Sequence, residues 1–156
     1  MKENERDAPG VVALPPLIYL AFLAAGIVLD RLFPVELLPD ALQYPLGIAL
    51  MAIAALVMPF VLRRFRKAGT SLDVRKPTSA LVTGGPYRFS RNPAYLSLTL
   101  LYAGIGVAAD SLWIVGLLVP VLAVMQYGVI LREERYLERK FGEDYLRYKR
   151  SVRRWL

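Results

Sequence analysis

The sequence contains neither cysteine nor histidine. Without cysteine the chain has no disulfide, no thiolate nucleophile and no cysteine-based metal site. Without histidine it lacks the commonest general base and the commonest metal ligand. Any chemistry must therefore use carboxylates, tyrosines, arginines, backbone groups or a bound cofactor, and we expect no metal site.

Polar residues are also scarce, because 56% of the 156 residues are hydrophobic and the mean hydropathy is +0.40. These values are too apolar for a typical soluble domain, and the length fits one domain over residues 1–156. The net charge of +7 is compatible with nucleic acid, but the basic residues flank apolar blocks and no stacking aromatic platform accompanies them. We therefore expect membrane lipids as partners, and no nucleic acid.

Four apolar blocks approach the length of a bilayer crossing, about 20 residues. They are residues 11–32, 42–62, 93–109 and 112–131. The basic loop between the second and third blocks is cytoplasmic by the positive-inside rule. The sequence thus predicts an all-α integral membrane bundle of four transmembrane helices in a bacterial or archaeal inner membrane. Both termini are expected in the cytoplasm, with residues 1–10 as a short flexible tail.

Residues 132–156 are highly charged, yet apolar side chains recur among them at spacings of three and four. At about 100° per residue these side chains form one stripe on a helix, opposite most of the arginines and lysines. We expect a C-terminal amphipathic helix over 132–156, lying on the membrane surface or packed over the cytoplasmic mouth of the bundle. The stripe comprises Leu137, Phe141, Tyr145, Tyr148, Val152 and Trp155.

Two adjacent glutamates begin this charged segment. On the same helical wheel Glu134 falls within the apolar stripe and Glu133 at its edge. A carboxylate on a packed face is unfavourable unless a partner satisfies it. Two partners fit: Arg88 or Arg91 of the basic loop in a structural ion pair, or a ligand that carries positive charge or hydroxyl groups.

The loop that precedes the third block is rich in residues with special backbone roles. Gly84, Gly85 and Pro86 predict a tight turn. Asn92 is a preferred N-cap residue, and Pro93 suits the first helical turn. Such a helix start offers free N–H groups and a partial positive charge to an anionic or polar ligand group. The alternative is an ordinary loop followed by an ordinary helix start.

Four segments together resemble one family by their order and spacing: Leu81–Tyr87, Arg91–Tyr95, Glu133–Leu137 and Phe141–Tyr148 with Val152. Over residues 44–156 the chain resembles the isoprenylcysteine carboxyl methyltransferase and phospholipid methyltransferase superfamily. These are integral membrane enzymes that use S-adenosylmethionine.

The resemblance implies a cofactor pocket and a function. Glu134 with Arg88 and Arg91 would be catalytic candidates, the arginines holding an acceptor phosphate or carboxylate or contacting lipid headgroups. Many members have histidine at Asn92, and the isoprenylcysteine enzymes have arginine at Val129, which disfavours a prenylcysteine acceptor. The S-adenosylmethionine pocket would comprise Ser79, Ala80, Leu81, Val82, Tyr87, Asn92, Pro93, Ala94, Tyr95, Glu133 and Glu134.

The expected activity is methyl transfer from S-adenosylmethionine to a lipophilic acceptor. The acceptor stays open between a phospholipid amine, an isoprenoid or quinone-like lipid, a prenylated thiol compound and a small thiol. The rival interpretation is a small non-enzymatic multispan membrane protein with a structural or assembly role. Stabilisation by S-adenosylhomocysteine would separate the two.

Overall fold

A computed structural model describes residues 8–156, and this part of the chain is helical, with no strand. Residues 1–7, most of the predicted flexible tail, lie outside the described part. The helices are α1 (Pro15–Leu32), α2 (Asp40–Ala68), the 3₁₀ turn η1 (Gly85–Arg88), α3 (Pro93–Ala108), α4 (Leu112–Gly116), α5 (Leu118–Met125), the π-helical turn η2 (Gln126–Ile130), α6 (Leu131–Phe141) and α7 (Glu143–Ser151).

Three helical segments of the described chain are long and apolar enough to cross a membrane: α1, α2 and the run from α4 to α6. The third expected span, α3, is apolar but has only 16 residues, which gives about 24 Å at 1.5 Å per residue. The bilayer core is about 30 Å thick. Three of the four predicted spans therefore have the length and composition of membrane-crossing helices, and the fourth, α3, is a shorter apolar helix packed among them.

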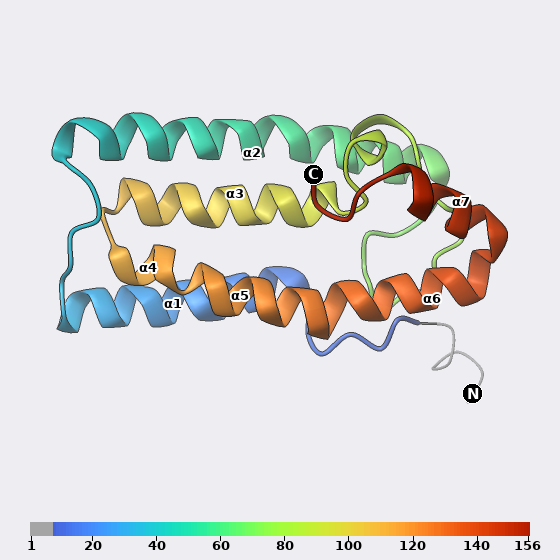
Figure 1. The fold of residues 1–156 in the computed structure, drawn as a ribbon, viewed down its shortest axis with the longest axis horizontal. Helices are drawn as coiled ribbons and strands as arrows, with labels where there is room; N and C mark the ends of the chain where they lie inside the picture. Colours follow the sequence, from blue (N-terminus) through green and yellow to red (C-terminus); the bar gives the residue numbers. More distant parts are fainter. Residues whose placement is uncertain (1–7) are drawn as a thin grey trace.

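The helices run alternately up and down in one bundle (Figure 1). The connections from α1 to α2 and from α3 to α4 lie together at one end, which we call the distal end. The loop 69–92 and α7 lie at the opposite end, which we call the cavity end, and the chain after α7 turns back and ends beside the start of α3. The basic loop thus shares an end with the C-terminal helix α7, as the sequence predicts. That this end faces the cytoplasm remains a prediction.

Small residues bring α2 and α3 into close contact. A Cβ atom built on Gly47 would lie 2.6 Å from the Ala108 Cβ and 2.8 Å from the Gly104 carbonyl oxygen. The Ser97 hydroxyl of α3 also donates a 2.9 Å hydrogen bond to the Ala54 carbonyl of α2. Gly47 therefore serves close helix packing.

Asp110 joins the two connections of the distal end. One of its carboxylate oxygens accepts hydrogen bonds from the backbone N–H groups of Leu37 and Leu38, at 3.0 and 2.9 Å. The Trp113 indole N–H donates to the Phe33 carbonyl at 2.6 Å. These contacts fix the start of α2 against the turn between α3 and α4.

The last apolar block continues without interruption into the charged α6. Its apolar part ends at Leu131, immediately before Arg132, and we take the membrane-spanning segment to end there. The π-helical turn just before this point has a buried face that includes Gly128 and Val129. Its Gly128 carbonyl accepts a 3.2 Å hydrogen bond from the backbone N–H of Val12. Residues 131–141 therefore project from the end of a long apolar helix.

The predicted single amphipathic helix over 132–156 is wrong. The helix breaks at Gly142, whose φ of 51° and ψ of −126° belong to a region that glycine adopts at little cost. After this break α7 packs over the cavity end of the bundle, where Tyr145 and Tyr148 pack with Val61 and Tyr87. The chain leaves the helix after Ser151, and the remainder, which we call the 152–156 segment, is not helical.

Candidate functional site

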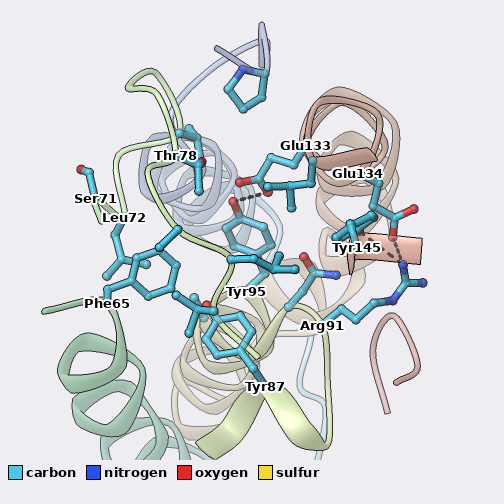
Figure 2. A pocket seen from close by; sticks show the side chains of 18 of the residues that line it. Phe65, Ser71, Leu72, Thr78, Tyr87, Arg91, Tyr95, Glu133, Glu134 and Tyr145 are labelled. Atoms are coloured by element: carbon cyan, nitrogen blue, oxygen red, sulfur yellow. Dashed lines mark hydrogen bonds and ion pairs between the residues drawn. The ribbon is translucent and has the colours of Figure 1, made fainter. Parts of the chain in front are cut away.

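A cavity lies at the cavity end, between the loop 69–92, the start of α3, and helices α6 and α7 (Figure 2). Its empty volume, open mouth included, is about 850 Å³. About 110 Å³ of this space lies free between the cavity walls. The cavity therefore has room for several water-sized groups, and a larger ligand would extend into its open mouth.

Most of the residues predicted for the cofactor pocket line this cavity. Ser79 is not among them, because its backbone N–H and hydroxyl bond to Thr70 and Gly69 of the loop. Pro93 is buried in the first turn of α3, and Arg88 is exposed outside the cavity. The predicted residues that line it are Ala80, Leu81, Val82, Tyr87, Arg91, Asn92, Ala94, Tyr95, Glu133 and Glu134.

Glu133 joins α6 to α3 across the cavity wall. Its Oε2 atom accepts a 2.7 Å hydrogen bond from the Tyr95 hydroxyl (Figure 2). Burial raises the pKa of the Glu133 carboxyl to about 7; the Tyr95 hydrogen bond opposes this rise, and the charge of Glu134 adds to it. The carboxyl therefore changes its charge near neutral pH, and a cationic ligand group would favour its ionised form.

Glu134 is buried, with 7% of its side chain exposed, and arginines hold it. Nε and Nη2 of Arg154 donate to its two carboxylate oxygens, at 2.8 and 2.9 Å. Nη1 of Arg91 lies 3.0 Å from Oε1, and Nζ of Lys149 lies 4.0 Å from Oε2. Of the two partners that the sequence leaves open, the structure contains the ion pair with Arg91. The two-nitrogen contact of the Arg154 guanidinium with Glu134, which we call the fork of Arg154, is not indicated by the sequence pattern.

Arg91 connects the cavity wall to α7 and to the 152–156 segment. Its Nη1 atom also contacts the Tyr145 hydroxyl at 3.5 Å, and its backbone N–H donates to the Arg153 carbonyl at 2.9 Å. Only 9% of the side chain is exposed. Within residues 8–156 the buried Nε atom has no hydrogen-bond partner. A buried donor without a partner is unfavourable, so one hydrogen bond of the Arg91 guanidinium is left unmade within the described chain.

Asn92 occupies the N-cap position of α3, as the sequence predicts, but its side chain makes no capping hydrogen bond. Its side-chain Nδ2 donates instead to the Arg154 carbonyl at 3.0 Å, because the 152–156 segment passes beside it. Its backbone carbonyl accepts from the N–H of Leu96, and Pro93 occupies the first turn as expected. The Asn92-Pro93 corner and the two glutamates therefore meet at the same end of the bundle, although through different hydrogen bonds.

The predicted tight turn places Tyr87. Gly85 has a φ of +64°, and a Cβ atom there would lie 2.7 Å from Nε of Arg64. The Tyr87 ring packs against Phe65 at 5.8 Å between centroids, and its carbonyl accepts a 2.7 Å hydrogen bond from the Tyr148 hydroxyl. Burial, with the charge of Glu133, raises the pKa of the Tyr87 hydroxyl well above its usual range. The Tyr87 hydroxyl therefore stays neutral. The ring contributes an apolar surface to the cavity wall, and the backbone carbonyl holds α7 through Tyr148.

Several lining residues were not predicted. Leu137, Tyr145 and Tyr148 belong to the apolar stripe of the tail, so periodicity marked them as packed without indicating a cavity. Phe65, near the end of α2, and Thr78, in the loop 69–92, carry no local signal of this kind, because tertiary packing brings them to the cavity. Among residues 8–156 there is no cluster of acidic side chains suited to a metal ion.

Apolar helices of membrane-crossing length, with a cavity at one end that is lined by apolar and charged side chains, are typical of an integral membrane protein. Residues 42–144, well over half of the chain, match the family model described as phospholipid methyltransferase. The chain belongs to the phospholipid methyltransferase family.

Three curated proteins are similar to shorter parts of the chain. An uncharacterized protein of Haemophilus influenzae is 44% identical over 68 residues, 40% of this chain and 98% of the relative. The cobalt-zinc-cadmium resistance protein CzcN of Cupriavidus metallidurans is 35% identical over 44% of this chain and 32% of its own length. The nickel-cobalt-cadmium resistance protein NccN of Alcaligenes xylosoxydans xylosoxydans is 37% identical over 47% of this chain and 35% of its length. The match thus covers about a third of each resistance protein. No solved structure matches the chain.

Proposed function

We propose that this chain is a methyltransferase that uses S-adenosylmethionine to methylate a lipophilic acceptor. The proposal is supported by the family and by one observation, a cavity whose wall carries a carboxyl group, Glu133, and a guanidinium with a free buried donor, Arg91. The amino-acid part of the cofactor carries an ammonium and a carboxylate, which need partners of these two kinds.

The residues present fit this cofactor. Glu133 is suited to the ammonium group or a ribose hydroxyl, and Arg91 to the carboxylate. Tyr87 and Tyr95 offer ring surfaces for adenine or for the positive sulfonium. The apolar lining that includes Leu81 completes a wall suited to the rest of the nucleoside.

When bound, S-adenosylmethionine supplies a methyl group on a good leaving group. The chain then needs mainly to align the acceptor, and alignment of this kind can lower a barrier by several kcal/mol. Tyr87 and Leu137 of the cavity wall would keep water from the reacting groups, while Glu133 and Arg91 would orient the cofactor through charge. No histidine base is needed if the acceptor is a free amine, a carboxylate or a thiol ionised elsewhere.

We propose that the acceptor is a membrane lipid and that it enters from the bilayer. The exposed apolar faces of α1 and α2 are suited to contact with lipid chains. At the cavity end Arg88 is exposed and the adjacent Phe89 is 77% exposed. A cation beside an exposed ring suits a headgroup region better than a catalytic role. Val129 is fully buried in an apolar core and offers no cation for a prenylcysteine carboxylate, so a phospholipid amine is the favoured acceptor.

Titration calorimetry in detergent with S-adenosylhomocysteine tests the cofactor site. We expect Glu133→Gln to weaken binding about tenfold, the effect of losing one charge-assisted hydrogen bond. Glu36→Gln is the matched control, because Glu36 is exposed at the distal end. Equal affinity in the wild type and the Glu133 variant would contradict the assignment. Absence of any binding or thermal stabilisation in the wild type would instead favour a non-enzymatic membrane protein.

The acceptor is tested separately. Purified protein in vesicles of host lipid extract is incubated with S-adenosylmethionine that carries a deuterated methyl group, and the lipids are analysed by mass spectrometry. We expect the label on a phospholipid amine. Label on a prenylated or quinone-like lipid would redirect the acceptor, and no labelled lipid at all would contradict the proposed reaction.

A further inference from the structure

The 152–156 segment is held beside the cavity by backbone and side-chain contacts. The Arg153 carbonyl accepts from the backbone N–H of Arg91, at 2.9 Å. The Arg154 carbonyl accepts from the Ser90 hydroxyl and the Asn92 side chain, at 3.3 and 3.0 Å. Beyond these, the Trp155 indole N–H donates to the Gln126 side chain at 3.3 Å. Arg154 therefore projects its side chain from a fixed backbone.

Arg154 and Arg91 share the carboxylate of Glu134 unequally. The fork of Arg154 engages both oxygens, through Nε at 2.8 Å and Nη2 at 2.9 Å. Arg91 reaches one oxygen through one nitrogen, at 3.0 Å. A two-pronged arginine–carboxylate pair is the stronger of these arrangements. Arg154 thus makes two of the three arginine contacts with the Glu134 carboxylate.

The unequal sharing leaves positive charge on the cavity wall. Lys149, the other cation near Glu134, forms a close ion pair with Glu138. The two guanidinium groups of Arg91 and Arg154 therefore face a single carboxylate. Arg91 lines the cavity and keeps a buried Nε without a partner in the described chain. The wall at Arg91 is consequently suited to one further anionic group.

We propose that Arg154 is a positioning residue: by engaging Glu134 with its fork, it keeps Arg91 available to bind an anionic group of a ligand in the cavity. This inference rests on the proposed function. The anionic group is a carboxylate or a phosphate, carried by the cofactor or by the acceptor lipid. Without Arg154, the Glu134 carboxylate would turn to Arg91, pair with it through both oxygens and neutralise it.

Binding measurements on Arg154→Gln test this proposal. The probes are S-adenosylhomocysteine, which has a carboxylate, 5′-methylthioadenosine, which lacks the amino-acid part, and a short-chain phosphatidylethanolamine. We expect about a tenfold loss for one of the two anionic probes and an unchanged affinity for methylthioadenosine. A loss for S-adenosylhomocysteine assigns the site to the cofactor carboxylate, and a loss for the lipid assigns it to the acceptor phosphate.

Arg150→Gln is the matched control, since it removes the same charge from an arginine that is 67% exposed on α7. Unchanged affinity of Arg154→Gln for both anionic probes overturns the inference. If the wild type binds neither nucleoside, the proposed function fails as well. If the wild type binds them and Arg154→Gln binds equally, only this inference fails.

A second variant separates positioning from a merely structural role. In Glu134→Gln/Arg154→Gln the group that would neutralise Arg91 is absent, so we expect recovery of most of the affinity that Arg154→Gln loses. A residue that only stabilised the fold would give a double variant at least as weak as the single one, and that result contradicts the proposal. Loss of methylthioadenosine binding in Arg154→Gln would likewise indicate general damage to the cavity and overturn it.

Discussion

Because Glu133 titrates near neutrality, cofactor binding should depend on pH. The pKa of its carboxyl is raised to about 7 by burial. A cationic ligand group requires the ionised form, so affinity should rise as pH rises toward and through 7. With this pKa about 3% of the carboxyl is ionised at pH 5.5 and about half at pH 7. The predicted gain over this interval is therefore about 15-fold, close to 1.6 kcal/mol.

Calorimetric titration of S-adenosylhomocysteine at several pH values in this interval measures the effect. The ligand α-amino group, with a pKa of about 7.7–8.0, stays mostly charged throughout. Glu133→Gln supplies the baseline, since it removes the titrating carboxyl and leaves any titration of the ligand. Tyr95→Phe should raise the pKa of Glu133 further, because the Tyr95 hydrogen bond lowers it, and so move the rise to higher pH. A wild-type profile that matches the Glu133→Gln profile would refute the reasoning.

Three further predictions concern stability, each measured by thermal unfolding in detergent with S-adenosylhomocysteine affinity as a second readout. Gly47→Val should lower the free energy of unfolding by about 1–3 kcal/mol, because the larger side chain overpacks against α3. Gly116→Ala is the control and should not lower it, because a Cβ atom there meets nothing within 4 Å. Equal stability of the two variants would contradict the close packing. Asp110→Ala should lower the free energy of unfolding by about 1–3 kcal/mol, because it removes the acceptor of two backbone N–H groups. The affinity for S-adenosylhomocysteine should stay unchanged. A loss of this affinity would argue against the independence of the two ends. Gly142→Ala should lower the free energy of unfolding by about 1–3 kcal/mol through backbone strain alone. It should also weaken the binding of S-adenosylhomocysteine, because α7 carries Tyr145 and Tyr148. Unchanged stability and affinity would show that the helix break needs no glycine.

The sequence predicts the helical architecture well because the apolar blocks are long and are separated by glycine, proline and charged residues that end helices. The loop between α2 and α3 illustrates this. Its positive φ at Gly85 and its helix start at Pro93 follow from the intrinsic preferences of these residues. The burial of Glu134 could also be predicted, because its place within an apolar stripe depends only on helical period.

The end of the chain could not be predicted in the same way. The apolar stripe continues in register on both sides of Gly142, so periodicity alone does not reveal the break. The fork between Arg154 and Glu134 exists only because α7 turns back, which brings together residues 20 positions apart. The Asn92 side chain likewise donates a hydrogen bond to a carbonyl of the 152–156 segment instead of capping α3. These outcomes depend on tertiary contacts, which local preferences do not contain.

The contacts of Asp110 and Trp113 bear on how a ligand could enter and leave. They link the connections at the distal end, so the helices have little freedom to separate there. Any spreading of the bundle during ligand exchange would be greatest at the opposite end, where a loop and the short helix α7 cover the cavity. The distal end would then act as a fixed hinge, and the tail of the proposed lipid acceptor would pass between the helices near the cavity end.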